Sequence, residues 1–158
     1  MTEGKSSKKR KPSSPRTHAS EFAPGIFVGG WKDAEGFVGQ RFCVLDEMPA
    51  DAPADQGLPI YDGAHEAPIL ANLDRVVELM RMAREAGEPV LVFCGHGVRR
   101  SPLAAAWYLH RMERLPLDEA YARVKAVRPQ VEHAREWITR WEILEKEKGR
   151  PARSTALR

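Results

Sequence analysis

The sequence contains only two cysteines and no long apolar run. Cys43 and Cys94 lie far apart, and neither has a zinc-like spacing to a histidine, so neither a disulfide scaffold nor a structural zinc site is expected. The longest apolar run, residues 103–109, has seven residues, whereas a membrane span needs roughly 18. No apolar stretch follows the charged N-terminus, so a secretory signal is not expected. These absences favour a soluble protein of a reducing compartment, with the cytoplasm as the expected location.

Positive charge is concentrated at one end of the chain. Residues 1–20 carry six Lys and Arg side chains against one Glu, a net charge of +5, whereas the whole chain carries +3. A basic, Ser- and Pro-containing segment cannot bury enough surface to offset its chain entropy, so we expect a disordered tail over 1–20. The basic run over 8–11 would suit a nuclear address in a eukaryote, or contact with nucleic acid or anionic lipid. A solvated extension is the simpler interpretation, and nothing in the rest of the chain calls for nucleic acid.

Short apolar runs separated by turn residues follow the tail. They predict strands over 26–29 and 41–45 and a third extended piece over 58–61. Asp33 is the expected N-cap of a brief helix over 34–38.

Apolar residues then recur at three- and four-residue spacing, which predicts a helix over 68–87 with Gly87 as its C-cap. The next segment, residues 89–93, is apolar at nearly every position, which is typical of a strand buried on both faces of a parallel sheet. Further helices are expected after the segment 94–102 to about Arg114, over 117–127, and over 132–148. In the last of these, Trp137, Trp141 and Leu144 form a stripe that we interpret as core. The pattern predicts an α/β domain over 22–148, with a central, mostly parallel sheet of four to five strands flanked by helices, and a flexible tail over 149–158.

Cys94 comes directly after the most apolar strand, at the sheet edge where α/β folds bind ligands. Gly95 and Gly97 allow the following loop to turn tightly and aim N–H groups inward. The loop leads into a helix N-terminus, which favours an anion, and Pro102 suits the first turn of that helix. Local sequence therefore predicts an anion cradle with a thiol at its mouth.

The cradle would activate the thiol, because helix N-termini and neighbouring cations stabilise a thiolate. Arg100 adds a planar fork of donors that matches two phosphate oxygens. A buried structural thiol is the alternative for Cys94, but a Gly-rich, cationic loop does not suit that role.

Residues 92–101, VFCGHGVRRS, resemble the signature loop of the protein tyrosine phosphatase superfamily, and the compact dual-specificity branch is the nearest match. The resemblance covers about residues 22–145. It implies that Cys94 is the nucleophile, that Arg100 binds phosphate, and that Ser101 stabilises Cys94 when the thiolate leaves. It also implies a ring of phosphate-binding backbone N–H groups from Gly95, His96, Gly97, Val98, Arg99 and Arg100. No metal and no organic cofactor is implied.

The family also carries an aspartate about thirty residues before the cysteine, which protonates the leaving oxygen. Asp62 lies 32 residues before Cys94, at the end of an expected strand and beside Gly63, and we interpret it as this general acid. Asp-Gly is also a common turn pair, so a turn former is the alternative. Glu66 and Asp46 are the reserve candidates.

The chain departs from the family pattern at two places. Phe93 stands where the family usually has a histidine that supports the thiolate, so weaker activation is expected. A Pro-Asn pair often follows the Arg-Pro of this branch, but residues 130–133 read Gln-Val-Glu-His. A buttress of the phosphate loop is therefore lost or replaced.

Three further residues have two interpretations each. His96 either faces substrate or points to solvent, and Arg99 either adds charge near the mouth of the site or is a solvated surface residue. Cys43 either forms a protective disulfide with Cys94 or is a core thiol, and its position within a strand favours the core thiol.

The resulting prediction is a cysteine-dependent protein phosphatase. It would hydrolyse phosphotyrosine, phosphoserine or phosphothreonine, or another phosphomonoester, through a phosphocysteine on Cys94. The alternatives are a phosphate-binding module without turnover, which Phe93 favours, and a rhodanese-like sulfurtransferase. We expect a monomer whose partner is the phosphorylated substrate.

Overall fold

The computed structural model describes residues 18–60 and 69–138. Strands and helices follow one another in the order β3 (Ser20–Ala23), β4 (Ile26–Gly30), α1 (Trp31–Glu35), β5 (Gln40–Cys43), β6 (Gln56–Gly57), α2 (Ile69–Glu85), β7 (Val90–Cys94), α3 (Arg100–Met112) and α4 (Leu117–Val127). None of the described helices is long and apolar enough to cross a membrane.

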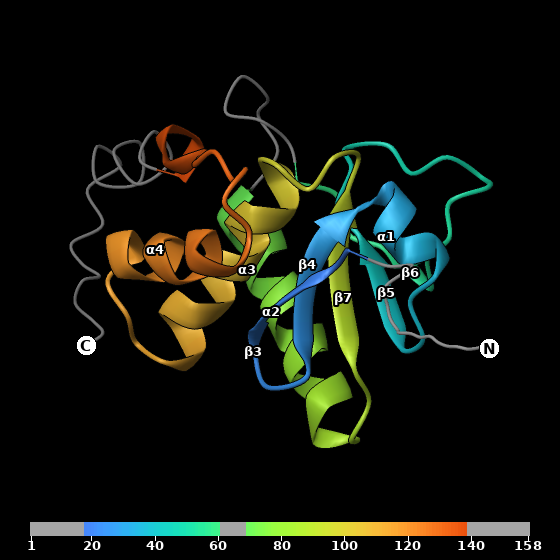
Figure 1. Ribbon diagram of the computed structural model, residues 1–158, viewed down its shortest axis with the longest axis horizontal. Helices are drawn as coiled ribbons and strands as arrows, with labels where there is room; N and C mark the ends of the chain where they lie inside the picture. Colours follow the sequence, from blue (N-terminus) through green and yellow to red (C-terminus); the bar gives the residue numbers. More distant parts are fainter. Residues whose placement is uncertain (1–17, 61–68, 139–158) are drawn as a thin grey trace, which may run out of the picture.

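The strands form one sheet in the order β3-β4-β7-β5-β6 (Figure 1). The pairs β4–β7, β7–β5 and β5–β6 are parallel, and β3 alone is antiparallel to its neighbour β4. The predicted α/β class with a mostly parallel sheet is therefore confirmed. Because β4 and β7 are parallel and in register, with Gly30 beside Cys94, their C-terminal ends meet at one edge of the sheet.

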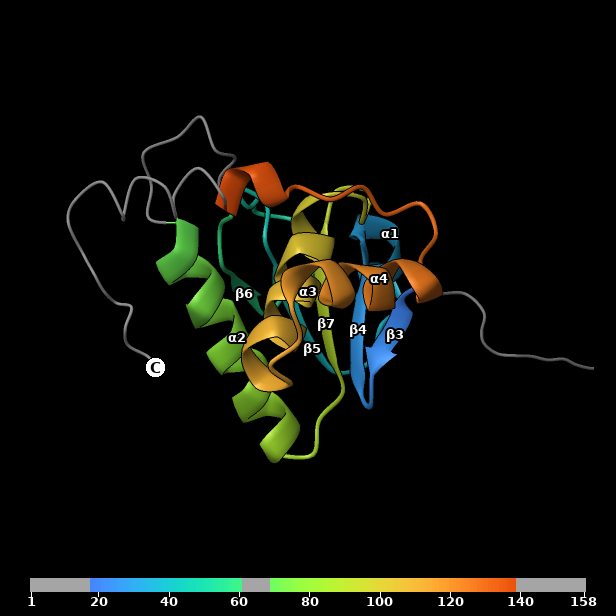
Figure 2. The same cartoon turned by 90° about the vertical axis from the view of Figure 1, so that its left-hand side faces the viewer.

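Helices cover both faces of this sheet unequally. In Figures 1 and 2, α2, α3 and α4 lie on one face, and the short α1 lies against the other. All five residues of β7 are buried, and successive side chains alternate between the faces. Val92 belongs to the large core under α2 and α3, whereas Leu91 and Phe93 pack with Ala34 of α1 in a smaller one. The prediction of a strand buried on both faces is confirmed.

Several sequence predictions match the observed elements. The helices expected over 68–87 and 117–127 are α2 and α4, and Gly87 has the positive φ of 84° that a helix-ending glycine adopts. The helix expected over 132–148 lies largely outside the described residues.

Other predictions need correction. Strand β3 begins at Ser20, so this residue belongs to the fold and not to the expected tail over 1–20. Helix α1 begins at Trp31, two residues before Asp33, so Asp33 is not its N-cap; its carboxylate instead accepts the Gly30 N–H at 2.8 Å. The strand in this region, β6, covers Gln56–Gly57 and therefore ends before the extended piece predicted over 58–61.

Candidate active site

Cys94 is the last residue of β7, and its sulfur contacts both the hydroxyl and the backbone N–H of Ser101. The Cys94 Sγ lies 3.2 Å from the Ser101 Oγ and 3.4 Å from the Ser101 N. The Ser101 hydroxyl donates to the Gly29 carbonyl at the end of β4, at 2.8 Å. Ser101 is fully buried in the first turn of α3. The structure therefore brings together the predicted nucleophile and the serine that is expected to stabilise it.

In the loop between β7 and α3, the backbone carbonyls point outward. Four consecutive carbonyls accept hydrogen bonds from groups outside the loop: Gly95 O from Trp31 N at 3.0 Å, His96 O from Arg128 Nη2 at 3.2 Å, Gly97 O from Arg128 Nε at 2.8 Å, and Val98 O from Glu132 N at 2.9 Å. In a trans peptide the N–H points opposite to the C=O, and the described residues contain no cis peptide bond. The N–H groups that follow these carbonyls are therefore turned to the inner side of the loop, as an anion cradle requires.

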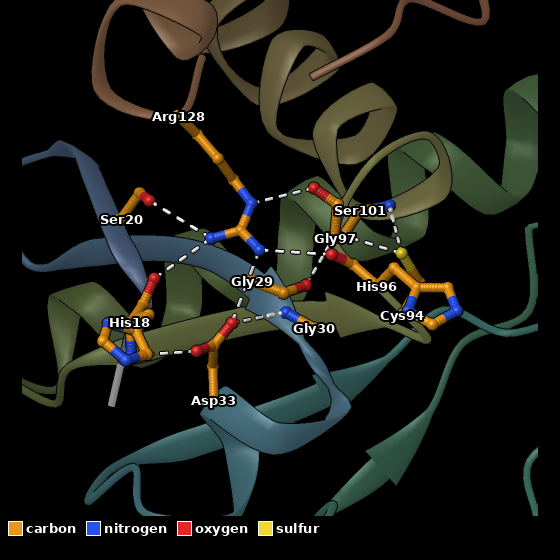
Figure 3. A network of polar contacts seen from close by, with 10 residues as sticks. All are labelled: His18, Ser20, Gly29, Gly30, Asp33, Cys94, His96, Gly97, Ser101 and Arg128. Atoms are coloured by element: carbon orange, nitrogen blue, oxygen red, sulfur yellow. Dashed lines mark hydrogen bonds and ion pairs between the residues drawn. The ribbon is translucent and has the colours of Figure 1, made fainter. Parts of the chain in front are cut away.

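Arg128 and Asp33 form a buried ion pair beneath the loop (Figure 3). Their closest charged atoms are 3.5 Å apart, and only 5% and 9% of the two side chains are exposed. Arg128 follows α4, and the next residues are held by Tyr121, whose hydroxyl accepts the Ala134 N–H at 3.0 Å. Burial raises the pKa of Tyr121 to about 12. The buttress that the missing Pro-Asn left open is therefore replaced by Arg128 and the Glu132 backbone.

A cavity of about 440 Å³ opens at the mouth of the loop. It is lined by Leu45, Cys94, Gly95, His96, Val98, Arg99 and Arg100. The guanidinium of Arg100 donates from Nε to the Ile60 carbonyl at 2.8 Å and reaches the Asp46 carboxylate at 3.5 Å. The predicted nucleophile and the predicted phosphate ligand thus border the same cavity.

Trp137 lies beside both arginines of the loop. The Arg99 and Arg100 guanidinium carbons are 5.2 Å and 5.7 Å from its ring centroid, within the range of cation–π attraction. The side chain of Trp137 is half-buried against the main core, so the prediction of a core residue is correct but incomplete. Arg99 also pairs with Glu136 at 2.7 Å, and its charge is partly compensated at the protein surface.

Phe93 and Cys43 lie on the other face of the sheet from Cys94. Phe93 packs edge-to-face against Trp31, with ring centroids 6.3 Å apart, so it offers the cysteine no polar support. Cys43 pairs in register with Phe93 and shares its smaller core. Burial raises the pKa of the Cys43 thiol. Because the two cysteine side chains project from opposite faces, the structure favours the core thiol and not a disulfide with Cys94.

The predicted general acid, Asp62, and its reserve Glu66 lie outside the described residues. Asp46, the other reserve, is present near the cavity through its contact with Arg100. His96 is exposed, and its backbone carbonyl, not its ring, makes the contact with Arg128. Within 18–60 and 69–138, no three His, Cys, Asp or Glu side chains are grouped so that they could hold a metal ion.

Sequence reasoning missed Asp33 and Arg128 as parts of the site. Arg128 had a weak signal, because it directly follows the helix predicted over 117–127 and precedes Pro129. Asp33 had none, because a capping role explained an acidic residue at the start of a short helix.

Comparison with known proteins agrees with this geometry. A family model for the dual specificity phosphatase catalytic domain matches residues 48–146. Rat dual specificity protein phosphatase 12 is 30% identical over 136 residues, which cover 75% of this chain and 39% of the relative. Human dual specificity phosphatase 28 is 31% identical over 120 residues, which cover 70% of this chain and 68% of the relative. The chain therefore spans about two fifths of the first relative and two thirds of the second.

Solved structures show the same fold. The crystal structure of human DUSP28 superposes with a TM-score of 0.68 at 26% identity, covering 89% of this chain and all of that one. The crystal structure of DUSP15 gives a TM-score of 0.67 at 18% identity, covering 80% and 86% of the two chains, and at that identity it shows the fold alone. Taken with the cysteine-arginine loop and its outward-turned carbonyls, the matches place this chain in the dual specificity phosphatase family, within the protein tyrosine phosphatase superfamily.

Proposed function

We propose that this chain is a protein phosphatase that hydrolyses phosphomonoesters through a phosphocysteine intermediate on Cys94. The observation that carries the proposal is the orientation of the loop. Four carbonyls in succession are bound from outside, so the intervening N–H groups face the cavity that Cys94 and Arg100 also line. A hollow lined by N–H donors, a thiol and an arginine suits a tetrahedral oxyanion.

In the first step of this mechanism, the Cys94 thiolate attacks phosphorus. The S–P bond forms as the P–O bond to the leaving group breaks, and Asp62 donates a proton to the departing oxygen. Charge spreads over the three equatorial oxygens, where the loop N–H groups and Arg100 stabilise it.

In the second step, water attacks the phosphocysteine. Asp62, now a carboxylate, takes a proton from the water, the P–S bond breaks, and inorganic phosphate forms. The sulfur leaves as a thiolate, and Ser101, 3.2 Å away, is placed to donate to it.

We propose phosphorylated tyrosine, serine or threonine side chains of proteins as the substrates. The printed names of the relatives, dual specificity protein phosphatase among them, support this class. Asp62 as the acid is supported by its spacing from Cys94 and by Ile60, two residues earlier, whose carbonyl contacts Arg100.

The test is hydrolysis of an aryl phosphate by the wild type, Cys94→Ser and Cys43→Ala. Loss of the nucleophile should reduce kcat by at least roughly 1,000-fold. Cys43→Ala is the matched control, because it removes the other thiol from the opposite face of the sheet, and it should keep most of the activity. Equal activity in wild type and Cys94→Ser would contradict the proposal.

The same proteins separate the alternatives. A phosphate-binding module would bind phosphate without turnover, and a sulfurtransferase would move sulfur from thiosulfate to cyanide. Either result, in place of ester hydrolysis, would replace the phosphatase assignment.

A further inference from the structure

Arg128 uses every N–H of its guanidinium, although it lies 31 residues from Gly97, the nearest residue of the loop that it contacts. Nε and Nη2 donate to the Gly97 and His96 carbonyls, and Nη2 also reaches Asp33 at 3.5 Å. Nη1 donates to the His18 carbonyl at 3.0 Å and to the Ser20 hydroxyl at 3.3 Å (Figure 3). A guanidinium has five donors in a fixed plane, so this arrangement leaves it a single orientation.

Asp33 offsets the energetic cost of burying the Arg128 guanidinium. A buried charge is stable only when it is paired and its remaining hydrogen-bonding capacity is satisfied. The Asp33 carboxylate faces Arg128 and also accepts the N–H groups of Gly30 and His18, both at 2.8 Å. These bonds fix the carboxylate at the end of β4, whose last residue, Gly30, pairs with Cys94 in the sheet.

The two carbonyls that Arg128 binds are in the middle of the phosphate loop. Gly97 has a φ of 70° and lacks a side chain that would hinder rotation of its peptide. If the His96 or Gly97 peptide rotated by half a turn, a carbonyl oxygen would replace an N–H at the oxyanion and repel it. Two parallel bonds from one rigid fork oppose this rotation, whereas a single ammonium cannot span both oxygens in the same way.

We propose that Arg128, oriented by Asp33, is a positioning residue that sets the oxyanion affinity of the loop. It touches neither the substrate nor the reacting atoms. It acts by keeping the His96 and Gly97 carbonyls outside, which leaves the N–H groups of Gly97 and Val98 directed at the bound oxygens. This inference rests on the proposed function, since it assumes that the loop binds a phosphate-like anion.

The test compares tungstate binding by the wild type and Arg128→Lys. Tungstate is a tetrahedral oxyanion, and its affinity is measured by titration calorimetry and by protection of Cys94 from iodoacetate. Lysine keeps a positive charge opposite Asp33 but loses the fork, so the fold should persist while tungstate binds roughly 10-fold more weakly, or about 1.4 kcal/mol. The same variant should move the pH profile of Cys94 alkylation, because fewer N–H groups would stabilise the thiolate.

Arg111→Lys is the matched control. Arg111 also forms an ion pair with an aspartate, Asp74, but at the far end of α3 and about half exposed. Its substitution should leave tungstate affinity within about twofold of the wild type. A folded Arg128→Lys protein with wild-type tungstate affinity and alkylation profile would overturn the inference, because Arg128 would then serve the fold alone.

Two further measurements apply if Arg128→Lys does not fold. The double variant Asp33→Asn with Arg128→Gln removes both buried charges together, and wild-type tungstate affinity in it would contradict the inference. In the unmodified protein, tungstate should slow hydrogen exchange at the Arg128 Nε–H, because linkage between the loop and the guanidinium is reciprocal. Unchanged exchange at saturating tungstate would likewise overturn it.

Failure of this inference and failure of the proposed function give different results. A wild type that binds tungstate but hydrolyses no phosphate ester would refute the phosphatase and leave the role of Arg128 standing. Hydrolysis that depends on Cys94, together with unaltered tungstate binding in Arg128→Lys, would refute only the positioning role.

Discussion

Ser101 has one hydroxyl proton and two neighbours that can receive it. In the structure the hydroxyl donates to the Gly29 carbonyl at 2.8 Å, and the Cys94 sulfur lies 3.2 Å from the same oxygen. While Cys94 is a thiol, its S–H can donate to the serine. When Cys94 leaves phosphorus as a thiolate, rotation of the hydroxyl would transfer the hydrogen bond from Gly29 to sulfur. Local geometry thus allows Ser101 to serve both states of Cys94.

Of the three candidate general acids, Asp62 and the reserve Asp46 can be told apart by their dependence on the leaving group. Asp62→Asn should reduce kcat by roughly 100-fold for alkyl phosphates, which need a proton on the leaving oxygen, and by much less for nitrophenyl phosphate. Asp46→Asn is the control, because Asp46 contacts Arg100 and its loss should affect both substrates alike. Steady-state kinetics with a series of leaving groups measures the difference. A leaving-group dependence in Asp46→Asn and none in Asp62→Asn would move the role to Asp46.

The sequence predicts the site residues that lie close together in the chain, and it misses those whose partners are distant in the chain. Cys94, Ser101 and the glycines of the loop lie within eight consecutive residues, so strand, turn and helix signals place them together. Asp33 and Arg128 are 95 residues apart, and only the packing of α1 and the segment after α4 against one sheet edge makes them neighbours.

The conformation of the loop between β7 and α3 depends more on Gly97 than on Gly95. A Cβ at Gly97 would lie 2.5 Å from Arg128 Nη2 and 2.6 Å from the Gly29 backbone, at a φ of 70°. A Cβ at Gly95 would meet nothing within 4 Å. The two glycines therefore look equivalent in the sequence but differ in the fold.

Gly97→Ala should lower the free energy of unfolding by about 2–4 kcal/mol, through left-handed strain and displacement of Arg128. Gly95→Ala, the matched substitution, should change it by less than about 1 kcal/mol. Urea unfolding of both variants beside the wild type measures the two values. Equal destabilisation by the two alanines would contradict the described loop conformation.

Elements with strong periodicity were predictable, and short ones at the sheet edge were not. The apolar stripe of α2 and the continuous apolar run of β7 gave nearly correct bounds. Strand β3 was missed because its four residues, SEFA, show little β pattern and are recruited by antiparallel pairing with β4. The start of α1 was misplaced because Asp33 is the third residue of the helix. Its carboxylate accepts the N–H of Gly30, the N-cap residue, as the third helical residue does in a capping box.

At the scale of the whole molecule, the parallel sheet gathers the site. Parallel pairing brings the C-terminal ends of β4, β5 and β7 to one edge, where ligands bind in α/β folds. The same pairing places Cys94 over the main core and Cys43 over the smaller one. One thiol therefore opens onto a cavity and the other is enclosed, although the sequence offers two cysteines in similar apolar strands.

We expect each turnover to transfer the phosphoryl group of the substrate to the sulfur of Cys94. The most direct measurement is rapid acid quench of the wild-type protein during its first turnover of an aryl phosphate, followed by peptide mass spectrometry. Phosphate should appear transiently on the peptide containing Cys94 and decay as inorganic phosphate forms. Hydrolysis at the full rate with phosphate absent from Cys94 throughout, or found on another residue, would contradict it.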